Sequence, residues 1–124
     1  MENLPSFPVG YRWLIQRGLV GYDAFTQLQP WHFVQLEQSF WVTERWPGVV
    51  DAKLFVFARR QDNDDMACFA VDESGEAGQV FLIRGWTKDG FEVIQEFPDV
   101  WAWLKGVVDD IAEWVSLDIV PDIL

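Results

Sequence analysis

An acidic run in the middle of the chain is the first candidate for chemistry. Asp62-Asn63-Asp64-Asp65 gathers carboxylate and amide oxygens as the start of a calcium-binding loop does, and Glu73 falls at the twelfth position. The match then fails, because Met66 stands at the fifth position and Ala67 replaces the glycine that such a loop needs for its turn. We therefore expect a solvated hairpin turn here and no calcium site.

Residues for acid–base or nucleophilic catalysis are scarce. His32 is the only histidine, which excludes a metal site built from several histidines. Cys68 is the only cysteine and lies in the apolar run 66–71, so a buried, inert thiol is expected and a disulfide within the chain is excluded. No Gly-x-Ser-x-Gly motif surrounds any of the serines, Ser6, Ser39, Ser74 and Ser116. We expect a non-catalytic protein without metal or cofactor; a small hydrolase or metal-dependent enzyme is the weakest alternative.

The charge of the chain is its most unusual bulk property. The 124 residues carry 20 acidic and 9 basic side chains, which gives a net charge of −11. This charge disfavours direct binding to nucleic acid and to anionic membranes, which are themselves polyanionic. It favours a basic protein partner, because opposite fields speed encounter and suppress wrong partners. The alternative is that the charge serves solubility alone.

The first residues and the hydropathy of the chain indicate whether the protein is secreted or inserted in a membrane. The first residues lack the basic region and the apolar stretch of a secretory signal. No apolar run approaches the length that crosses a bilayer. The sequence therefore predicts a cytoplasmic protein that is not inserted in a membrane.

Three acidic residues lie late in a predicted C-terminal helix, where the helix dipole is negative. Carboxylates at that end are slightly unfavourable for the helix itself, so an external basic partner is one explanation and an ordinary solvated face is the other. An exposed tryptophan earlier in the helix, Trp101, is a candidate anchor, or else packs on the first helix or the tail. The candidate partner-binding residues are Asp62, Asp64, Asp65, Trp101, Asp109, Asp110 and Glu113.

Four apolar runs separated by polar turns predict the sheet that must position these residues. Asp89-Gly90 is a strong turn pair within this region. The links are too short for parallel crossovers, so neighbouring strands must be antiparallel. The run at 54–58 is apolar on both alternating sets, as in a strand covered on both faces. The predicted strands are 53–59, 66–71, 79–84 and 91–95.

Helical spacing predicts three helices around the sheet. Tyr11, Leu14 and Ile15 indicate a first helix that Gly18 ends, and a middle helix is expected over 32–46, closed by Pro47-Gly48. The segment 21–28 is expected to be a short strand or loop edge. Asp99 is the expected N-cap of the last helix. Its apolar stripe comprises Val100, Trp103, Leu104, Val107, Val108, Ile111 and Val115. Together these elements predict one α+β domain over residues 1–124, an antiparallel meander of about four to six strands with helices packed against it.

Several segments of the chain match the pattern of a known family. They are Leu4-Pro5 with 11–15 and Gly18, then 54–58, 68–72, 80–83 and 97–104. With these segments the chain resembles the SUKH superfamily, which includes fungal cell-wall-synthesis regulators and bacterial toxin-immunity proteins. The likeness covers most of the chain, with departures at Arg17-Gly18, where Asn-Gly is usual, and in the unusually aromatic segment 32–46.

The resemblance implies an α+β domain that acts by binding. Bacterial members of the superfamily commonly neutralise a toxin, often a nuclease, by occluding it, and the superfamily has no shared catalytic residues. We therefore expect a bacterial immunity-type protein that binds a basic toxin; the alternative is a regulatory or scaffolding domain of the same fold without a toxin partner. Fold likeness alone does not establish activity.

Overall fold

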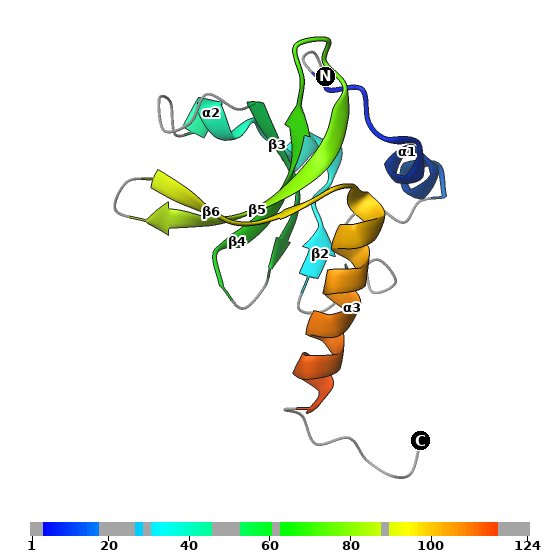
Figure 1. Ribbon diagram of the computed structural model, residues 1–124, viewed down its shortest axis with the longest axis vertical. Coiled ribbons are helices and arrows are strands. Elements are labelled where there is room, and N and C mark those ends of the chain that lie inside the picture. Colours follow the sequence, from blue (N-terminus) through cyan, green and yellow to red (C-terminus); the bar gives the residue numbers. More distant parts are fainter. Residues whose placement is uncertain are drawn as a thin grey trace.

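One antiparallel sheet organises the protein. The computed structural model describes residues 4–17, 27–28, 31–45, 53–60, 63–87 and 90–116. Within them, six strands follow one another across the sheet in chain order, and every neighbouring pair is antiparallel (Figure 1). The strands are β1 (Gln27–Leu28), β2 (Trp31–Phe33), β3 (Lys53–Arg60), β4 (Asp65–Val71), β5 (Ala77–Thr87) and β6 (Gly90–Phe97). The predicted meander is confirmed.

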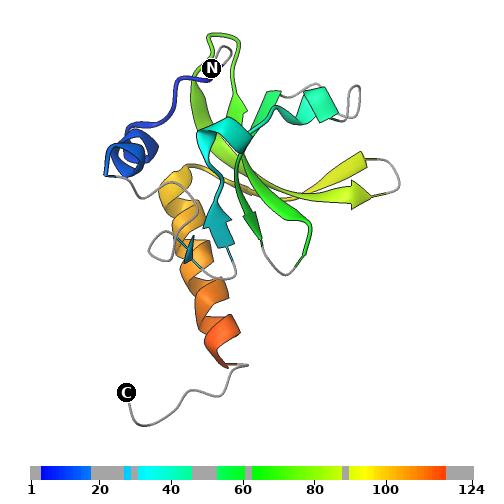
Figure 2. The same ribbon diagram turned by 180° about the vertical axis from the view of Figure 1, so that it is seen from behind.

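Helices cover both faces of this sheet. Figures 1 and 2 show α1 and α3 to one side of the strands and α2 to the other. The helices are α1 (Val9–Gln16), a 3-10 turn η1 (Leu36–Gln38), α2 (Val42–Arg45) and α3 (Val100–Ser116). An N-terminal, a middle and a C-terminal helix are therefore present, and the α+β prediction is confirmed. The expected stops at Gly18 and Pro47-Gly48 lie outside the described residues.

The predicted middle helix over 32–46 is wrong in its extent. His32 belongs to β2, and only Val42–Arg45 is α-helical. The segment instead runs beside β3: the Val34 amide donates to the Phe57 carbonyl, and the Val56 amide donates to the Phe40 carbonyl, each at 2.9 Å. These bonds satisfy backbone groups of β3. Pairing with β3 therefore favours an extended conformation over the helix that the spacing of the aromatic residues suggests.

The larger core lies between the sheet and helices α1 and α3. The rings of Phe57 and Phe69 stack with centroids 4.2 Å apart. Tyr11 meets both rings edge-on, and Trp103 meets Phe57 edge-on. Trp31 packs edge-on against Trp103 at 5.6 Å. All five side chains are buried. Because aromatic rings bury large areas, this cluster is the main apolar contact that fixes both helices on the sheet.

A second core lies on the opposite face, under α2. Val42 of α2 packs with Leu54, Met66, Cys68 and Phe91 of the sheet, and all five are buried. β3 contributes Leu54 to this cluster and Phe57 to the first one. The prediction that the strand at 54–58 is covered on both faces is therefore confirmed.

α3 begins and packs largely as expected. Oδ1 of Asp99 accepts a hydrogen bond of 2.8 Å from the Ala102 amide, so Asp99 is the N-cap. Val100, Trp103 and Val107 are buried. The expectation for Val108 is wrong, because it follows Val107 by about 100° around the helix and is 62% exposed.

β6 forms one edge of the sheet. Leu82 of β5 pairs with Gln95 while Ile83 pairs with Val93, so Ile94 is an extra residue and forms a bulge. Side chains 92–96 are exposed on both faces of the strand. β6 therefore reaches the two cores only near its ends, through Phe91 and Phe97.

Candidate functional site

The acidic residues predicted near the β3–β4 turn have different surroundings. Asp64 is exposed, whereas Asp65 is 5% exposed. The Arg84 Nε donates to Oδ1 of Asp65 at 3.1 Å across the β4–β5 pair. Asp65 thus has a partner within the chain, which leaves Asp64 as the exposed candidate here. Asp62 lies outside the described residues.

The acidic residues of α3 also divide into two kinds. Asp109 and Glu113 are exposed. Oδ2 of Asp110 accepts a hydrogen bond from the Trp31 indole Nε1 at 2.9 Å and lies 3.7 Å from a guanidinium nitrogen of Arg60. Asp110 therefore holds the end of β2 and β3 to α3. A cleft of about 240 Å³ beside this contact is lined by Asp109 and Asp110 together with Arg60, so its charge is mixed.

Trp101 is half-exposed, as expected, and it also packs on the first helix. A Cβ placed on Gly10 of α1 would lie 2.5 Å from Cζ2 of the Trp101 ring. The expected packing on the first helix is therefore present, while the role of the half-exposed indole as a partner anchor stays a prediction. Its neighbour Trp103 is buried.

His32 and Cys68, the residues considered for catalysis, both lie in the described part of the chain. Among the described residues, no group of three or more His, Cys, Asp or Glu side chains is placed to hold a metal ion. Cys68 is fully buried, and this burial raises the pKa of its thiol. His32 is half-buried on β2 instead of lying at a helix N-terminus; burial, and then the nearby charge of Arg59, lower its pKa.

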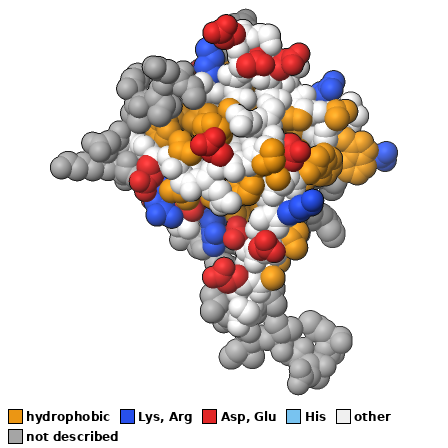
Figure 3. All heavy atoms as spheres, viewed as in Figure 1, with side chains coloured by type: hydrophobic (Ala, Val, Ile, Leu, Met, Phe, Trp, Pro, Cys, Tyr) orange, Lys and Arg blue, Asp and Glu red, His pale blue; other side chains and the backbone are white. Residues whose placement is uncertain are grey.

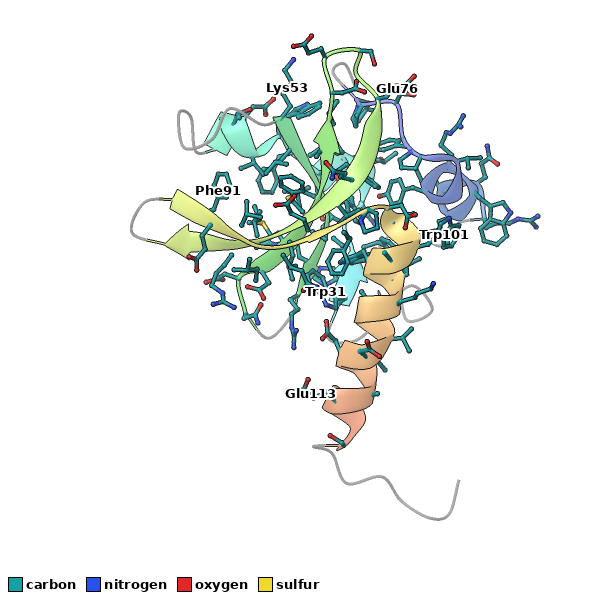
Figure 4. All side chains as sticks on the ribbon, viewed as in Figure 1. Trp31, Lys53, Glu76, Phe91, Trp101 and Glu113 are labelled. Carbon is teal, nitrogen blue, oxygen red and sulfur yellow. The ribbon has the colours of Figure 1, made fainter. Side chains whose placement is uncertain are left out.

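An acidic cleft is a better candidate site, and it lies at the end of the molecule farthest from the C-terminal end of α3 (Figure 1). We call it the β4–β5 cleft; it encloses about 320 Å³. Red side chains gather at this end in Figure 3, and Figure 4 labels Lys53 and Glu76 there. Three carboxylates and one ammonium group line it. The lining residues are Leu4, Pro5, Trp41, Thr43, Glu44, Lys53, Val71, Asp72, Glu73 and Gly75.

A short polar turn builds one wall of the β4–β5 cleft. Oδ1 of Asp72 accepts hydrogen bonds from the Ser74 amide at 2.9 Å, the Ser74 hydroxyl at 2.6 Å and the Glu76 amide at 3.0 Å. Gly75 adopts φ of 87°, which favours glycine. The Ser74 hydroxyl and the Glu76 amide lower the Asp72 pKa, because they stabilise the carboxylate.

The N-terminal segment closes the cleft from one side. The Ser6 amide donates to the Gly75 carbonyl at 2.8 Å, and the Ala77 amide donates to the Ser6 carbonyl at 2.9 Å. These two bonds fix Leu4 and Pro5 beside the turn. The chain thus places apolar side chains next to the acidic residues of the β4–β5 turn.

An aromatic side chain and an acidic residue come from the segment before β3. Trp41 meets Phe55 edge-on with ring centroids 5.1 Å apart, which orients the indole at the cleft. The Glu44 amide donates to the Trp41 carbonyl at 3.1 Å, which starts α2 and places Glu44 at the rim. An apolar wall with carboxylates at its rim suits the methylene stem and cationic head of a lysine or arginine side chain.

The sequence interpretation missed this cleft. The sequence predicts only a polar turn at 72–78, and it places Glu44 within the long middle helix. Glu44 and Glu73 are far apart in the sequence, and only the pairing of β3 with β4 brings their segments together. The local signal that could have been read is the Asp-x-Ser-Gly turn at Asp72.

Comparisons of the chain with protein-family models, with curated proteins and with solved structures found no match. Among the described residues, none of the helices combines the length and the apolar character needed to cross a bilayer. The site is therefore interpreted from its own geometry.

Proposed function

We propose that this protein is a non-catalytic binding domain whose β4–β5 cleft receives cationic side chains of a basic protein partner. The observation that carries the proposal is a single cleft lined by the acidic residues Glu44, Asp72 and Glu73 and by the aromatic side chain of Trp41. Carboxylates at the rim attract a cation and the apolar wall packs its stem, so both terms favour the same ligand. Lys53 at the cleft partly offsets the charge, which leaves three carboxylates against one ammonium.

The net charge of −11 supports the same partner at long range. Such a field accelerates encounter with a basic protein, while apolar contacts at the interface supply most of the affinity. Asp64, Asp109 and Glu113 are exposed and add to this field. They remain predicted contributors to steering.

The resemblance to the SUKH superfamily favours a more specific role. We propose that the partner is a basic toxin, for example a nuclease, and that the protein is a cytoplasmic bacterial immunity protein that occludes it. A regulatory or scaffolding domain would bind a basic protein that has no toxic activity. A toxin gene beside the gene for this chain, together with rescue of growth when both are expressed, would separate the two roles.

Binding to the tagged protein in a lysate of its native host tests the proposal. We expect a basic protein to be recovered in larger amount at about 50 mM salt than at about 500 mM, because salt screens the exposed charges that speed encounter. The variant Glu44→Gln with Glu73→Gln should weaken binding of that purified protein about tenfold, since two rim charges are lost. Asp72 is left unchanged because it orders the turn.

Two matched variants control for overall charge. Glu92→Gln with Glu96→Gln removes the same charge from β6 and should leave the affinity within about twofold. Asp109→Asn with Glu113→Gln tests α3 in the same way and should mainly lower the association rate. Recovery of no basic protein, or equal losses in all three variants, would contradict a specific cleft.

A further inference from the structure

Four large apolar side chains are exposed on the outer faces of α1 and α3. Val9 is 72% exposed and Trp13 is 48% exposed, four residues apart on α1. Trp101 is 50% exposed and Val108 is 62% exposed, seven residues apart on α3. Each spacing places its two residues on one side of a helix. We call these four side chains the α1–α3 patch.

The two halves of the α1–α3 patch are joined at Gly10. The 2.5 Å approach of a Cβ at Gly10 to the Trp101 ring shows that the α1 backbone passes directly against the indole. Figure 3 shows orange side chains gathered where α1 meets the start of α3, and Figure 4 labels Trp101 beside α1. The ring is therefore held in place before any partner arrives, which lowers the entropy lost on binding.

Basic side chains lie beside this patch, although the protein as a whole is acidic. The described segment 4–17 contains Arg12 and Arg17 and no acidic residue. Lys105 lies between Trp101 and Val108 on the exposed stripe of α3. The Arg17 guanidinium carbon is 5.1 Å from the centroid of the Trp13 ring. Among the described residues, Arg12 and Lys105 form no ion pair.

We propose that the α1–α3 patch docks an acidic, apolar segment of a partner protein. Exposed tryptophans beside arginine are the residues most often found as binding hot spots. The cations Arg12, Arg17 and Lys105 would meet carboxylates of that segment, and Trp13 and Trp101 would receive its apolar side chains. This surface is separate from the β4–β5 cleft and selects a partner of the opposite charge.

A protein segment fits this surface better than an anionic bilayer does. A bilayer presents negative charge over its whole plane, so the overall charge of −11 opposes its approach. A single segment meets only the local cations. The three cations can therefore attract a single acidic segment, whereas the net negative charge of the protein repels an extended anionic bilayer.

Selection from a phage library of short random peptides tests the proposal on the full chain. We expect enriched peptides to combine Asp or Glu with Leu, Phe or Trp, and to shift the indole N–H signals of Trp13 and Trp101 in a ¹⁵N spectrum. Trp13→Ala with Trp101→Ala should weaken their binding at least about tenfold. Thermal unfolding followed by circular dichroism verifies that each variant is folded.

Charge variants separate this surface from the cleft. Arg12→Glu, Arg17→Glu and Lys105→Glu together should abolish binding of the selected peptides, while Arg12→Lys, Arg17→Lys and Lys105→Arg should keep it within about threefold. The cleft variant Glu44→Gln with Glu73→Gln should bind the selected peptides with unchanged affinity. The test of the α1–α3 patch therefore does not depend on whether the β4–β5 cleft binds a basic partner.

Four outcomes would overturn the proposal. Selected peptides rich in Lys or Arg would do so, as would peptides whose binding does not depend on Trp13 and Trp101. Binding of phosphatidylserine-containing vesicles through the patch, without peptide binding, would assign it to a membrane. Concentration-dependent shifts of both indole signals in the protein alone would assign it to a second copy of this chain.

Discussion

The indole nitrogen of Trp31 lies 2.9 Å from Oδ2 of Asp110, although 79 residues separate the two along the chain. Trp31 is buried, and its N–H has one hydrogen to donate. The bond therefore ties the end of the sheet to the middle of α3, and the guanidinium of Arg60 lies 3.7 Å from the same carboxylate oxygen. An acidic residue that looked available for a partner is a structural acceptor.

Removing this acceptor should destabilise the fold. We expect Asp110→Ala to lower the free energy of unfolding by about 1–3 kcal/mol, because a buried indole N–H loses its acceptor. The adjacent, exposed Asp109→Ala should change it by less than about 0.5 kcal/mol. Urea titrations measure both. In a Trp31→Phe background the effect of Asp110→Ala should shrink, and an unchanged effect would show that the bond contributes nothing.

A substitution at Gly10 should be poorly tolerated. The Cβ of alanine would lie 2.5 Å from the Trp101 ring, so the helix or the indole must move. We expect Gly10→Ala to lower the free energy of unfolding by about 1–3 kcal/mol, despite the better helix propensity of alanine. Gly78→Ala is the matched control, because a Cβ there meets nothing within 4 Å. Equal melting temperatures for the two variants would contradict the close packing.

The hydroxyl of Tyr11 is buried and has no hydrogen-bond partner among the described residues. This burial raises the Tyr11 pKa. Tyr11→Phe removes an unsatisfied polar atom and keeps the ring, so we expect the free energy of unfolding to stay constant or rise by up to about 1 kcal/mol. Tyr11→Leu, which deletes ring contacts, should lower it by about 1–3 kcal/mol. A clear loss of stability in Tyr11→Phe would reveal a partner for the hydroxyl.

The Asp72 carboxylate should make stability depend on acid pH. Its pKa in the folded protein lies below the ordinary value of 3.8, first through the Ser74 hydroxyl and then through the Glu76 amide. A lowered folded-state pKa stabilises the protein above the unfolded-state pKa, and this contribution disappears as pH falls through the folded-state pKa.

Denaturant titrations between neutral and strongly acidic pH check this dependence. We expect wild type to exceed Asp72→Asn in stability at neutral pH and the difference to diminish in acid. Ser74→Ala should show a smaller pH-dependent difference, because it removes the largest cause of the shift. A difference between wild type and Asp72→Asn that is constant with pH would contradict the role of the charge.

The sequence predicted the sheet well and the segment before it poorly. Runs such as 54–58 and 66–71 are apolar and bounded by turn residues, so local pattern and tertiary environment agree. In the segment 32–46, Phe33, Leu36 and Phe40 have helical spacing, yet Phe33 packs in the α1/α3 core and Phe40 against the core under α2. Residues on one face of a helix could not pack against two opposite faces of the sheet, so the segment is not one helix.

The candidate sites were less predictable because they depend on distant pairs. The acidic character of the surface could be read from composition, and the exposure of Trp101 from its position off the apolar stripe of the last helix. The roles of Asp65 and Asp110 could not, since Arg84 and Trp31 reach them only after the strands pair and α3 docks. The same holds for the β4–β5 cleft, where Glu44 and Glu73 come from separate segments.

The bulge at Ile94 and the exposed glutamates Glu92 and Glu96 have a consequence for crowded conditions. The bulge disrupts the regular spacing of hydrogen-bonding groups that a strand from a neighbouring molecule would need in order to pair with this edge. Pairing of two β6 edges would also bring their glutamates close together. Fibre growth by strand addition is thereby discouraged at this edge. The apolar pair Val93 and Ile94 can stay solvent-facing without seeding aggregation.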